Sequence, residues 1–199
     1  GRFGNAEETL TQFVTDYSEH KMFYEAAFNL GQAQMELRKW GNAIKSYKKV
    51  PEGSPLHHRA LYQSGRSKRF GGKDAEAIPF YKEFLEHYAN NPMANDVAFE
   101  LAELEFEKGG QNGGADSVKR LTALLGKKPN AVLRQKTLFK LGIVQFSEEN
   151  HEASAAAFEE MLKGPPVGLA IDAAWQAGEA RRLVAISQKS GANYRLLDL

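Results

Sequence analysis

The sequence contains no cysteine among its 199 residues. Structural disulfides, thiolate zinc sites, iron–sulfur clusters and cysteine-based catalysis are therefore excluded. The same absence fits an oxidising and a reducing compartment equally well, so it does not locate the protein.

Long apolar runs are also missing. No stretch approaches the roughly 18 uninterrupted apolar residues of a membrane-spanning helix, so we expect no membrane insertion of this segment. The chain begins at Gly1, without a methionine or the apolar region of a signal peptide. We interpret it as a piece of a longer or processed protein.

Neither sign of charge dominates. The 26 basic and 25 acidic side chains leave a formal net charge of +1, so no global charge draws the protein to nucleic acid or to an anionic membrane. We expect no nucleic-acid partner, because acidic residues are interleaved between the basic blocks. The hydrophobic content of 42% and the charged content of 26% are those of a folded globular protein.

An internal repeat runs through the sequence. The segment around Gly31 recurs 34 positions later around Gly65, and then around Ala102, Gly142 and Gly178. All but the last copy are followed by a second apolar segment. Within each segment the apolar residues are three and four positions apart, as in an amphipathic helix, and none shows the alternation of a half-buried strand. The sequence therefore predicts an all-α chain of helix–turn–helix units, with small residues where paired helices approach closely.

Proline positions indicate where these units end. Pro55, Pro92, Pro129 and Pro166 each lie just after a second helix, where a residue that cannot continue a helix separates two units. Pro79 instead falls early in an expected helix, so we predict a late helix start or a kink there. The predicted organisation is one solenoid over residues 1–199, with a half unit at 1–18, units at 21–54, 55–90, 92–128 and 130–165, and a terminal half unit at 167–199.

The repeat pattern resembles the tetratricopeptide repeat family over almost the whole chain, although the third unit departs from it through Gly109–Gly114 and Ser117. The resemblance implies a right-handed α-solenoid whose first helices form a concave inner wall. The loose spacing is similar to bacterial cell-envelope members, including outer-membrane assembly lipoproteins and Tol-Pal-associated periplasmic proteins, which implies a periplasmic or cell-envelope location. The matching residues are Leu30, Gly31, Trp40, Ala43, Tyr47 and Pro55, then Gly65, Ala77 and Tyr81, then Leu141, Gly142, Phe158 and Pro166.

No pattern of catalytic or metal-binding residues is present, and we predict no catalytic residue, no metal and no cofactor. The five histidines fall at expected helix ends or loops, and none forms the His-Glu-x-x-His pair that places two ligands on one helix face. The glycine run Gly109–Gly114 lacks the Gly-Lys-Ser/Thr ending of a phosphate-binding loop and follows a helix. We expect it to be a flexible insertion between helices.

Charged residues occur in alternating blocks. Residues 59–73 carry basic charges only, residues 96–107 acidic charges only, and residues 119–140 are again basic. Because neighbouring first helices lie side by side in a solenoid, these blocks predict ion pairs between repeats. Exposed pairs of this kind contribute about 0.2–1 kcal/mol each.

Aromatic residues mark the face that the resemblance places in the groove. When Gly31 is taken as the eighth residue of its unit, the fifth residue of every unit is aromatic. These rings either anchor a partner or fill the interior, and the sequence leaves both open. Asn29 and Arg59 fit two positions of a clamp for a peptide carboxylate, but Gln63 stands where an arginine is needed. The candidate binding residues are Phe28, Arg59, Tyr62, Arg66, Arg69, Phe99, Glu103, Phe106, Phe139, Phe146 and Trp175.

The predicted function is a non-enzymatic scaffold that binds a protein or peptide segment in the concave groove, with the cell-envelope setting implied by the resemblance. The alternative is an accessory, recruitment or self-association domain of a larger enzyme or sensor. We expect the terminal half units to leave apolar residues such as Phe3 and Ile186 uncovered, which predicts weak self-association through the ends.

Overall fold

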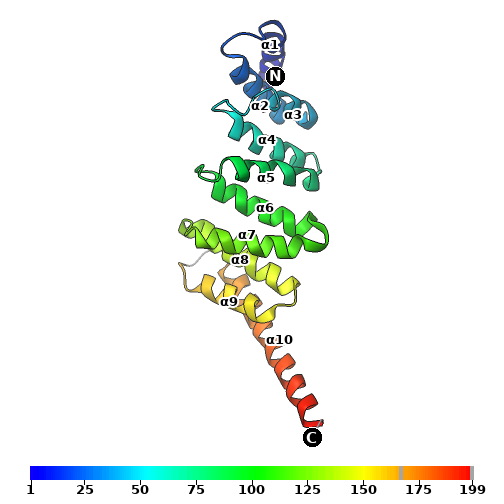
Figure 1. The fold of residues 1–199 in the computed structure, drawn as a ribbon, viewed down its shortest axis with the longest axis vertical. Helices are drawn as coiled ribbons and strands as arrows, with labels where there is room; N and C mark the ends of the chain where they lie inside the picture. The colour runs from blue at the N-terminus through cyan, green and yellow to red at the C-terminus, as the bar shows by residue number, and fades with distance from the viewer. Residues whose placement is uncertain (166–167, 198–199) are drawn as a thin grey trace. The chain divides into compact units, whose positions relative to one another are not determined.

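The chain folds into helices that follow one another through short turns (Figure 1). A computed structural model describes the backbone of residues 1–165 and 168–197 and the side chains of residues 1–165 and 168–189, so Pro166 lies outside the described residues. This part of the chain contains no strand, and the predicted all-α class is confirmed. The elements are α1 (Arg2–Asp16), α2 (Phe23–Glu36), α3 (Trp40–Tyr47), α4 (His57–Phe70), the 3-10 turn η1 (Asp74–Ala77), α5 (Ile78–His87), α6 (Ala94–Lys108), the 3-10 turn η2 (Gly110–Asn112), α7 (Gly113–Gly126), α8 (Ala131–Ser147), α9 (His151–Leu162) and α10 (Ala170–Leu197).

Two compact units divide the chain, Gly1–Val97 and Ala98–Leu199. The prediction of one solenoid over the whole chain stays a prediction.

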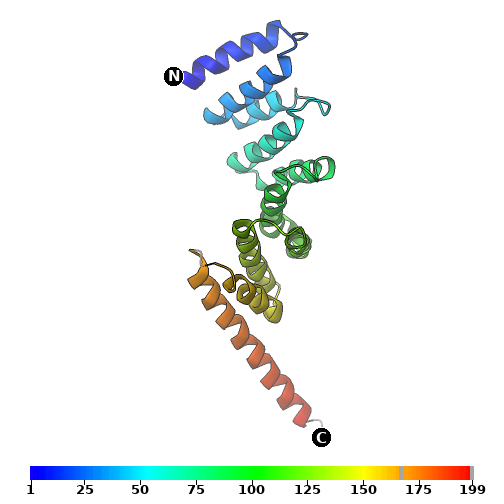
Figure 2. The same cartoon turned by 90° about the vertical axis from the view of Figure 1, so that its left-hand side faces the viewer.

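In the first unit each helix packs on the next along the chain. α1 contacts α2, α2 contacts α3, α3 contacts α4, and α4 contacts η1 and α5 (Figure 2). Val14, Ala27 and Leu30 belong to the core between α1 and α2. Phe28 and Tyr47 belong to the next cluster, which α2, α3 and α4 enclose. Burying these apolar side chains stabilises the unit, at about 25 cal/mol for each Å² removed from water.

An aromatic ring of the second helix of each pair in this unit packs directly against a glycine of the first helix. A β-carbon added to Gly31 would lie 2.5 Å from Cε1 of Tyr47. Tyr81 covers Gly65 in the same way. Real β-carbons do not approach other atoms this closely, so the predicted close approach of paired helices is confirmed in this unit.

Pro79 explains the late start of α5. The chain first forms the 3-10 turn Asp74–Ala77, and α5 begins at Ile78 with the proline in its first turn. Proline is tolerated there because the first amide groups of a helix have no partner inside the helix. The predicted late start is confirmed.

The second unit repeats the same pairing. α7 packs on α8, α8 on α9, and α9 on α10. A β-carbon added to Gly142 would lie 2.6 Å from Cζ of Phe158, and Ser154 Oγ donates a 2.8 Å hydrogen bond to the carbonyl oxygen of Gly142. At the start of α8 the Asn130 side chain accepts a hydrogen bond from the backbone N–H of Leu133, at 3.0 Å.

The glycine run before α7 differs from the expected flexible insertion. Gly110–Asn112 form a 3-10 turn, and Gly113 and Gly114 are buried in the first turn of α7. A β-carbon at Gly113 would collide with the carbonyl oxygen of Glu105, and one at Gly114 with the carboxylate of Glu148. The expectation was wrong for these two glycines, because close packing of helix ends requires them.

Ion pairs join the acidic block to the basic block that follows it. Arg120 forms two hydrogen bonds with Glu105, of 2.7 and 2.8 Å. Lys140 Nζ lies 3.4 Å from Glu107 Oε1 and 3.8 Å from Glu103 Oε1. Arg120 and Glu105 belong to the same predicted unit, 92–128, whereas Lys140 belongs to the next one. The predicted pairing between repeats is therefore confirmed for the contacts of Lys140.

Candidate partner-binding groove

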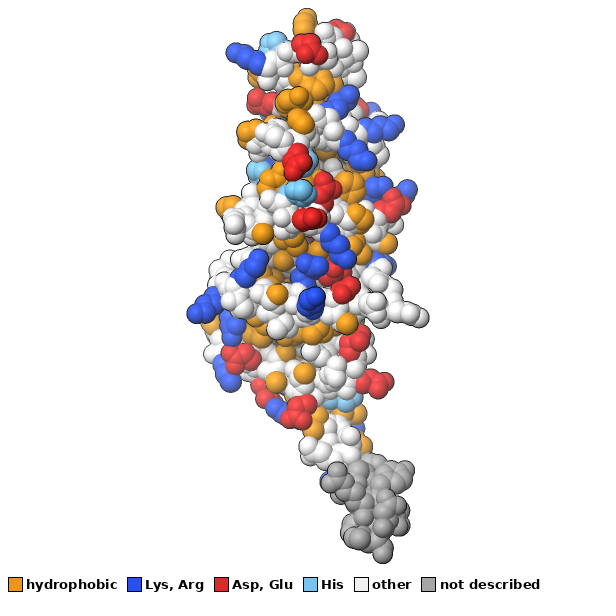
Figure 3. Space-filling view, viewed as in Figure 1, with side chains coloured by type: hydrophobic (Ala, Val, Ile, Leu, Met, Phe, Trp, Pro, Cys, Tyr) orange, Lys and Arg blue, Asp and Glu red, His pale blue; other side chains and the backbone are white. Residues whose placement is uncertain are grey.

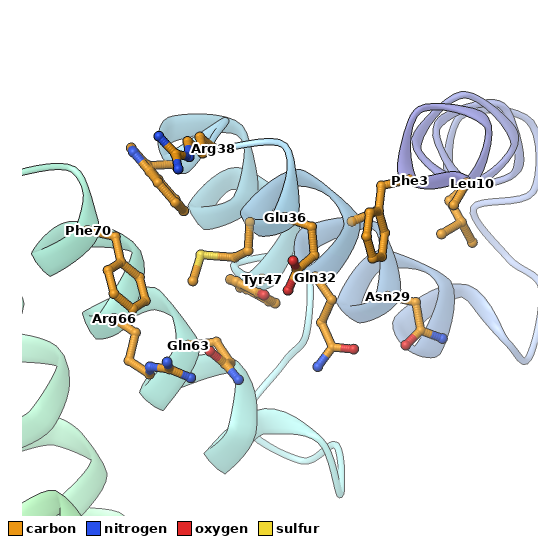
Figure 4. A pocket seen from close by; sticks show the side chains of 14 residues that line it. Phe3, Leu10, Asn29, Gln32, Glu36, Arg38, Tyr47, Gln63, Arg66 and Phe70 are labelled. Atoms are coloured by element: carbon orange, nitrogen blue, oxygen red, sulfur yellow. The ribbon is translucent and has the colours of Figure 1, made fainter. Parts of the chain in front are cut away.

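A cavity of about 1030 Å³ opens in the first unit between α1, α2 and α4 (Figure 4). A second cavity of about 380 Å³ shares Asn29 and Gln32 with it, so the two meet along α2. We call them together the α2–α4 groove. Its lining combines aromatic side chains (Phe3, Trp40, Phe70), amides (Asn29, Gln32, Gln63), bases (Lys21, Arg38, Arg59, Arg66) and acids (Glu25, Glu36).

The repeat itself positions this face. Residues spaced four, three and four apart lie on one side of a helix, and α2 and α4 use the same spacing. Each contributing residue of α4 lies 34 positions after its counterpart on α2. The counterparts are Glu25 and Arg59, Asn29 and Gln63, Gln32 and Arg66, and Glu36 and Phe70.

Figure 4 shows how the larger cavity is arranged. Gln63, Arg66 and Phe70 come from α4 on one side, and Phe3 and Leu10 come from α1 on the other. Tyr47 lies between these two walls. The cavity therefore offers hydrogen-bonding groups and apolar surface within one opening.

Aromatic rings hold both arginines of the α4 wall. The guanidinium carbon of Arg59 lies 4.8 Å from the Phe28 ring centroid. That of Arg66 lies 5.1 Å from the Phe70 centroid and 5.8 Å from the Tyr62 centroid. Such cation–π contacts contribute about 0.5–1 kcal/mol at exposed sites and orient the side chain.

The Tyr47 hydroxyl is an unusual feature of the cavity floor. Tyr47 is only 1% exposed, and its hydroxyl has no hydrogen-bond partner in the described part of the chain. Burial raises the pKa of Tyr47 well above its usual range, the positive charge of Arg66 opposes that shift, and Glu36 adds to it. A buried hydroxyl without a partner is costly, by about 1–3 kcal/mol.

The candidate rings of the first unit mostly pack inside it. Phe28 is 2% exposed and lies in the core, with Arg59 over its face. Tyr62 is half-buried and stacks on Tyr81, with centroids 5.8 Å apart. Arg69 is half-buried and already engaged by another group. Of these candidates, Phe28, Arg59 and Arg66 line the groove.

Most candidates of the second unit contact other residues of that unit. Phe99 and Phe106 are half-buried against the core formed by Ala102, Leu121 and Val144. Phe139 meets Phe158 edge to face at 5.7 Å, and Phe146 lies 5.2 Å from the ring of His151. Glu103 is paired with Lys140, whereas Trp175 is 64% exposed. Their role as groove residues stays a prediction.

Several groove residues were not among the sequence candidates. Gln32, Glu36 and Phe70 line the larger cavity, and so does Phe3, for which the sequence predicts only a place at the uncovered end of the chain. The 34-residue register could have identified the first three. Gln32 stands one repeat before the candidate Arg66, Phe70 directly follows the candidate Arg69, and Glu36 stands one repeat before Phe70.

The described side chains, those of residues 1–165 and 168–189, include no cluster of three or more potential metal ligands. None of the helices in the same ranges is long and apolar enough to cross a bilayer.

The paired helices, the rings packed against glycine and the 34-residue register define a helical-repeat protein. Two tetratricopeptide-repeat family models match the chain, one over residues 1–58 and the other over residues 59–91. The predicted resemblance to this family is therefore confirmed over residues 1–91.

Solved structures extend the likeness of fold to most of the chain. A crystal structure of MamA is 19% identical, covers 90% of this chain and 98% of its own, and has a TM-score of 0.62. Repeats of a putative kinesin light chain from Podospora anserina are 17% identical, with 81% and 85% covered and a TM-score of 0.62. The C-terminal part of a repeat-containing protein from Cytophaga hutchinsonii is 13% identical, with 96% and 69% covered and a TM-score of 0.70.

These likenesses confirm the tetratricopeptide-type solenoid class and nothing finer. Comparison with curated proteins gave no match. The expected likeness to cell-envelope lipoproteins and Tol-Pal-associated proteins has no support in these comparisons.

Proposed function

We propose that the protein is a non-enzymatic scaffold that binds a segment of a protein partner in the α2–α4 groove. Tetratricopeptide repeats and a groove lined by amides, charges and rings both support this proposal. Interfaces of this kind rely on aromatic and arginine residues for most of their binding energy.

The composition of the groove is the observation that carries the proposal. Asn29, Gln32 and Gln63 each offer an amide donor and an amide acceptor, which are the groups that the backbone of an extended segment needs. Phe3 and Phe70 are exposed by about half, at 47% and 54%, and they offer apolar surface for its side chains. The cavity volume of about 1030 Å³ lies at the upper end for small-molecule sites, and the adjoining cavity lengthens the groove along α2.

A random twelve-residue peptide library displayed on phage tests this function without assuming a partner. We expect selection on the wild type to enrich peptides that do not bind the Gln32→Trp variant, because the new indole fills the place where the two cavities meet. Lys45→Trp is the matched control, since Lys45 is exposed on α3 and lines neither cavity.

Peptides that bind both variants as tightly as the wild type would place binding outside the groove. A library that yields no specific binder would contradict the proposal, provided that circular dichroism shows the wild type to be folded.

A further inference from the structure

We infer that the segment held in the α2–α4 groove is acidic, with one Asp or Glu carboxylate bound by Arg66 and a second bound by Arg59. This inference rests on the proposed function and adds the chemical class of the partner to it.

The first observation is an imbalance of unpaired charge. Four basic side chains line the groove against two acidic ones, Glu25 and Glu36. None of the six forms an ion pair with another residue in the described part of the chain, although ion pairs such as Lys39 with Glu7 form nearby. The groove therefore presents a surplus of positive charge that the chain itself does not neutralise, and a segment of the opposite sign would be complementary to it.

The second observation is that the two arginines are already oriented. The guanidinium carbons of Arg59 and Arg66 lie over aromatic rings, 4.8 Å and 5.1 Å from the ring centroids. A guanidinium group over a ring keeps its N–H edge free, and that edge binds a carboxylate through two parallel hydrogen bonds. Because the rings restrict the side chains beforehand, less conformational entropy is lost on binding.

The spacing of the arginines fits one continuous segment. Arg59 and Arg66 are seven residues apart on α4, which corresponds to roughly 10 Å along a helix axis. An extended segment covers that distance in about three residues, at roughly 3.3 Å per residue. Two acidic residues about three positions apart can therefore reach both guanidinium groups.

The third observation is the orphan hydroxyl of Tyr47. It is buried in the cavity lining, lacks a partner, and lies within the electrostatic field of Arg66. A carboxylate on Arg66 would accept a hydrogen bond from this hydroxyl and remove the cost of leaving it unpaired. Glu36 lies across the Tyr47 ring from Arg66 (Figure 4). Where the partner segment faces Glu36 on the α2 wall, a neutral or basic residue of that segment is therefore favoured.

The peptides enriched from the library test this inference. We expect them to contain more Asp and Glu than Lys and Arg. The most enriched peptide is then synthesised with an acetylated N-terminus and an amidated C-terminus, which removes its terminal charges. Changing its acidic residues to Asn and Gln should weaken binding by about tenfold or more, as for the loss of charge-assisted hydrogen bonds.

Protein variants complete the test. Arg66→Gln should weaken binding of the capped peptide by about tenfold or more. The affinity of Arg66→Lys should lie between those of Arg66→Gln and the wild type. Lysine keeps the positive charge but lacks the two parallel N–H groups of the guanidinium. The combined change in protein and peptide should weaken binding less than the product of the single effects. Lys45→Gln, which removes a positive charge outside the groove, should bind like the wild type.

The outcomes separate the two proposals. Enriched peptides that need the groove but show no acidic surplus, or that bind Arg66→Gln as tightly as the wild type, would overturn the acidic inference and leave the proposed function standing. Absence of any groove-dependent peptide would overturn both. Thermal denaturation of each variant shows whether it is folded before its affinity is compared.

Discussion

Corresponding faces of the two units carry the same kind of contact but neutralise charge differently. In the first unit Arg66 lies over Phe70 and has no carboxylate partner among the described residues. In the second unit Lys140 lies 5.4 Å from the Phe106 centroid and pairs with both Glu103 and Glu107. One repeat pattern thus gives a face with free charge and a face with internal ion pairs.

The difference shows that the rings alone do not make a binding surface. Figure 3 shows basic and acidic side chains interspersed over one face of the molecule, so the presence of charge is not distinctive either. What distinguishes the first unit is a basic side chain, Arg66, that lies over an aromatic ring and has no carboxylate partner among the described residues. In the second unit Glu103 and Glu107 supply that acid from within the chain.

The largest expected effect concerns the rings of the second unit. Phe139 is half-buried and packs edge to face on Phe158, so Phe139→Ala should lower the free energy of unfolding by about 2–4 kcal/mol. Trp175 is 64% exposed, and Trp175→Ala should change it by no more than about 0.5 kcal/mol. Urea denaturation measures both. Equal stability of Phe139→Ala and wild type would mean that this ring is free to serve as a binding anchor.

Replacing a glycine that packs against an aromatic ring should lower the stability of either unit. Gly142→Leu should cost on the order of 1–3 kcal/mol, because its side chain would meet the Phe158 ring. Gly178 is the matched control, since a β-carbon there would meet no atom within 4 Å. Thermal denaturation that shows the same midpoint for Gly142→Leu and wild type would contradict the close packing of Phe158 on Gly142.

The contrast between the glycine–ring contacts and the α2–α4 groove also shows what the sequence can predict. Apolar spacing and the recurring glycine predict helices, pairs and the close approach at Gly31, because these depend on local geometry. Phe28 could not be assigned in this way, since only the placement of α4 shows that Arg59 covers its ring. Gln32 looks like any solvated polar residue until α4 is placed beside it. The groove therefore emerges from the pairing of two repeats and not from either sequence segment alone.

A transplanted ion pair should sharpen the comparison. In the repeat register Gln63 corresponds to Lys140, Gln32 to Glu103, and Glu36 to Glu107. The double variant Gln32→Glu/Gln63→Lys should therefore reproduce the charge arrangement of the second unit in the groove. We expect its stability to change by no more than about 1 kcal/mol and its affinity for the acidic peptide to fall several-fold, because Glu at position 32 competes for the basic groups. Calorimetric titration measures the affinity, and unchanged binding would count against a groove selected by charge.

The smallest expected effect is a pH dependence confined to the first unit. Burial lowers the pKa of His58, the neighbouring charge of Arg59 adds to this, and a hydrogen bond with the Pro55 backbone opposes it. The folded state therefore favours the neutral imidazole, so its contribution to stability is present above about pH 6.5 and is lost as the pH falls below that value.

Thermal denaturation at pH 7.5 and 5.5 measures this contribution. We expect the wild type to lose more stability between the two values than His58→Gln, in which no imidazole can be protonated beside Arg59. His58 also contacts the ring of Phe84 on α5 and the ring of Tyr88 just after it, so stability at pH 7.5 serves as the check that their packing survives. An identical loss in both proteins would remove His58 as the cause.

The central claim is that a partner segment occupies the α2–α4 groove of the first unit. Nuclear magnetic resonance titration of the labelled protein with the capped, library-selected peptide tests it most directly. We predict that the largest shifts fall on the side-chain amides of Asn29, Gln32 and Gln63 and on the guanidinium of Arg66, with little change at Lys140 and Trp175. Shifts concentrated in the second unit or on the exposed face of α3 would contradict it.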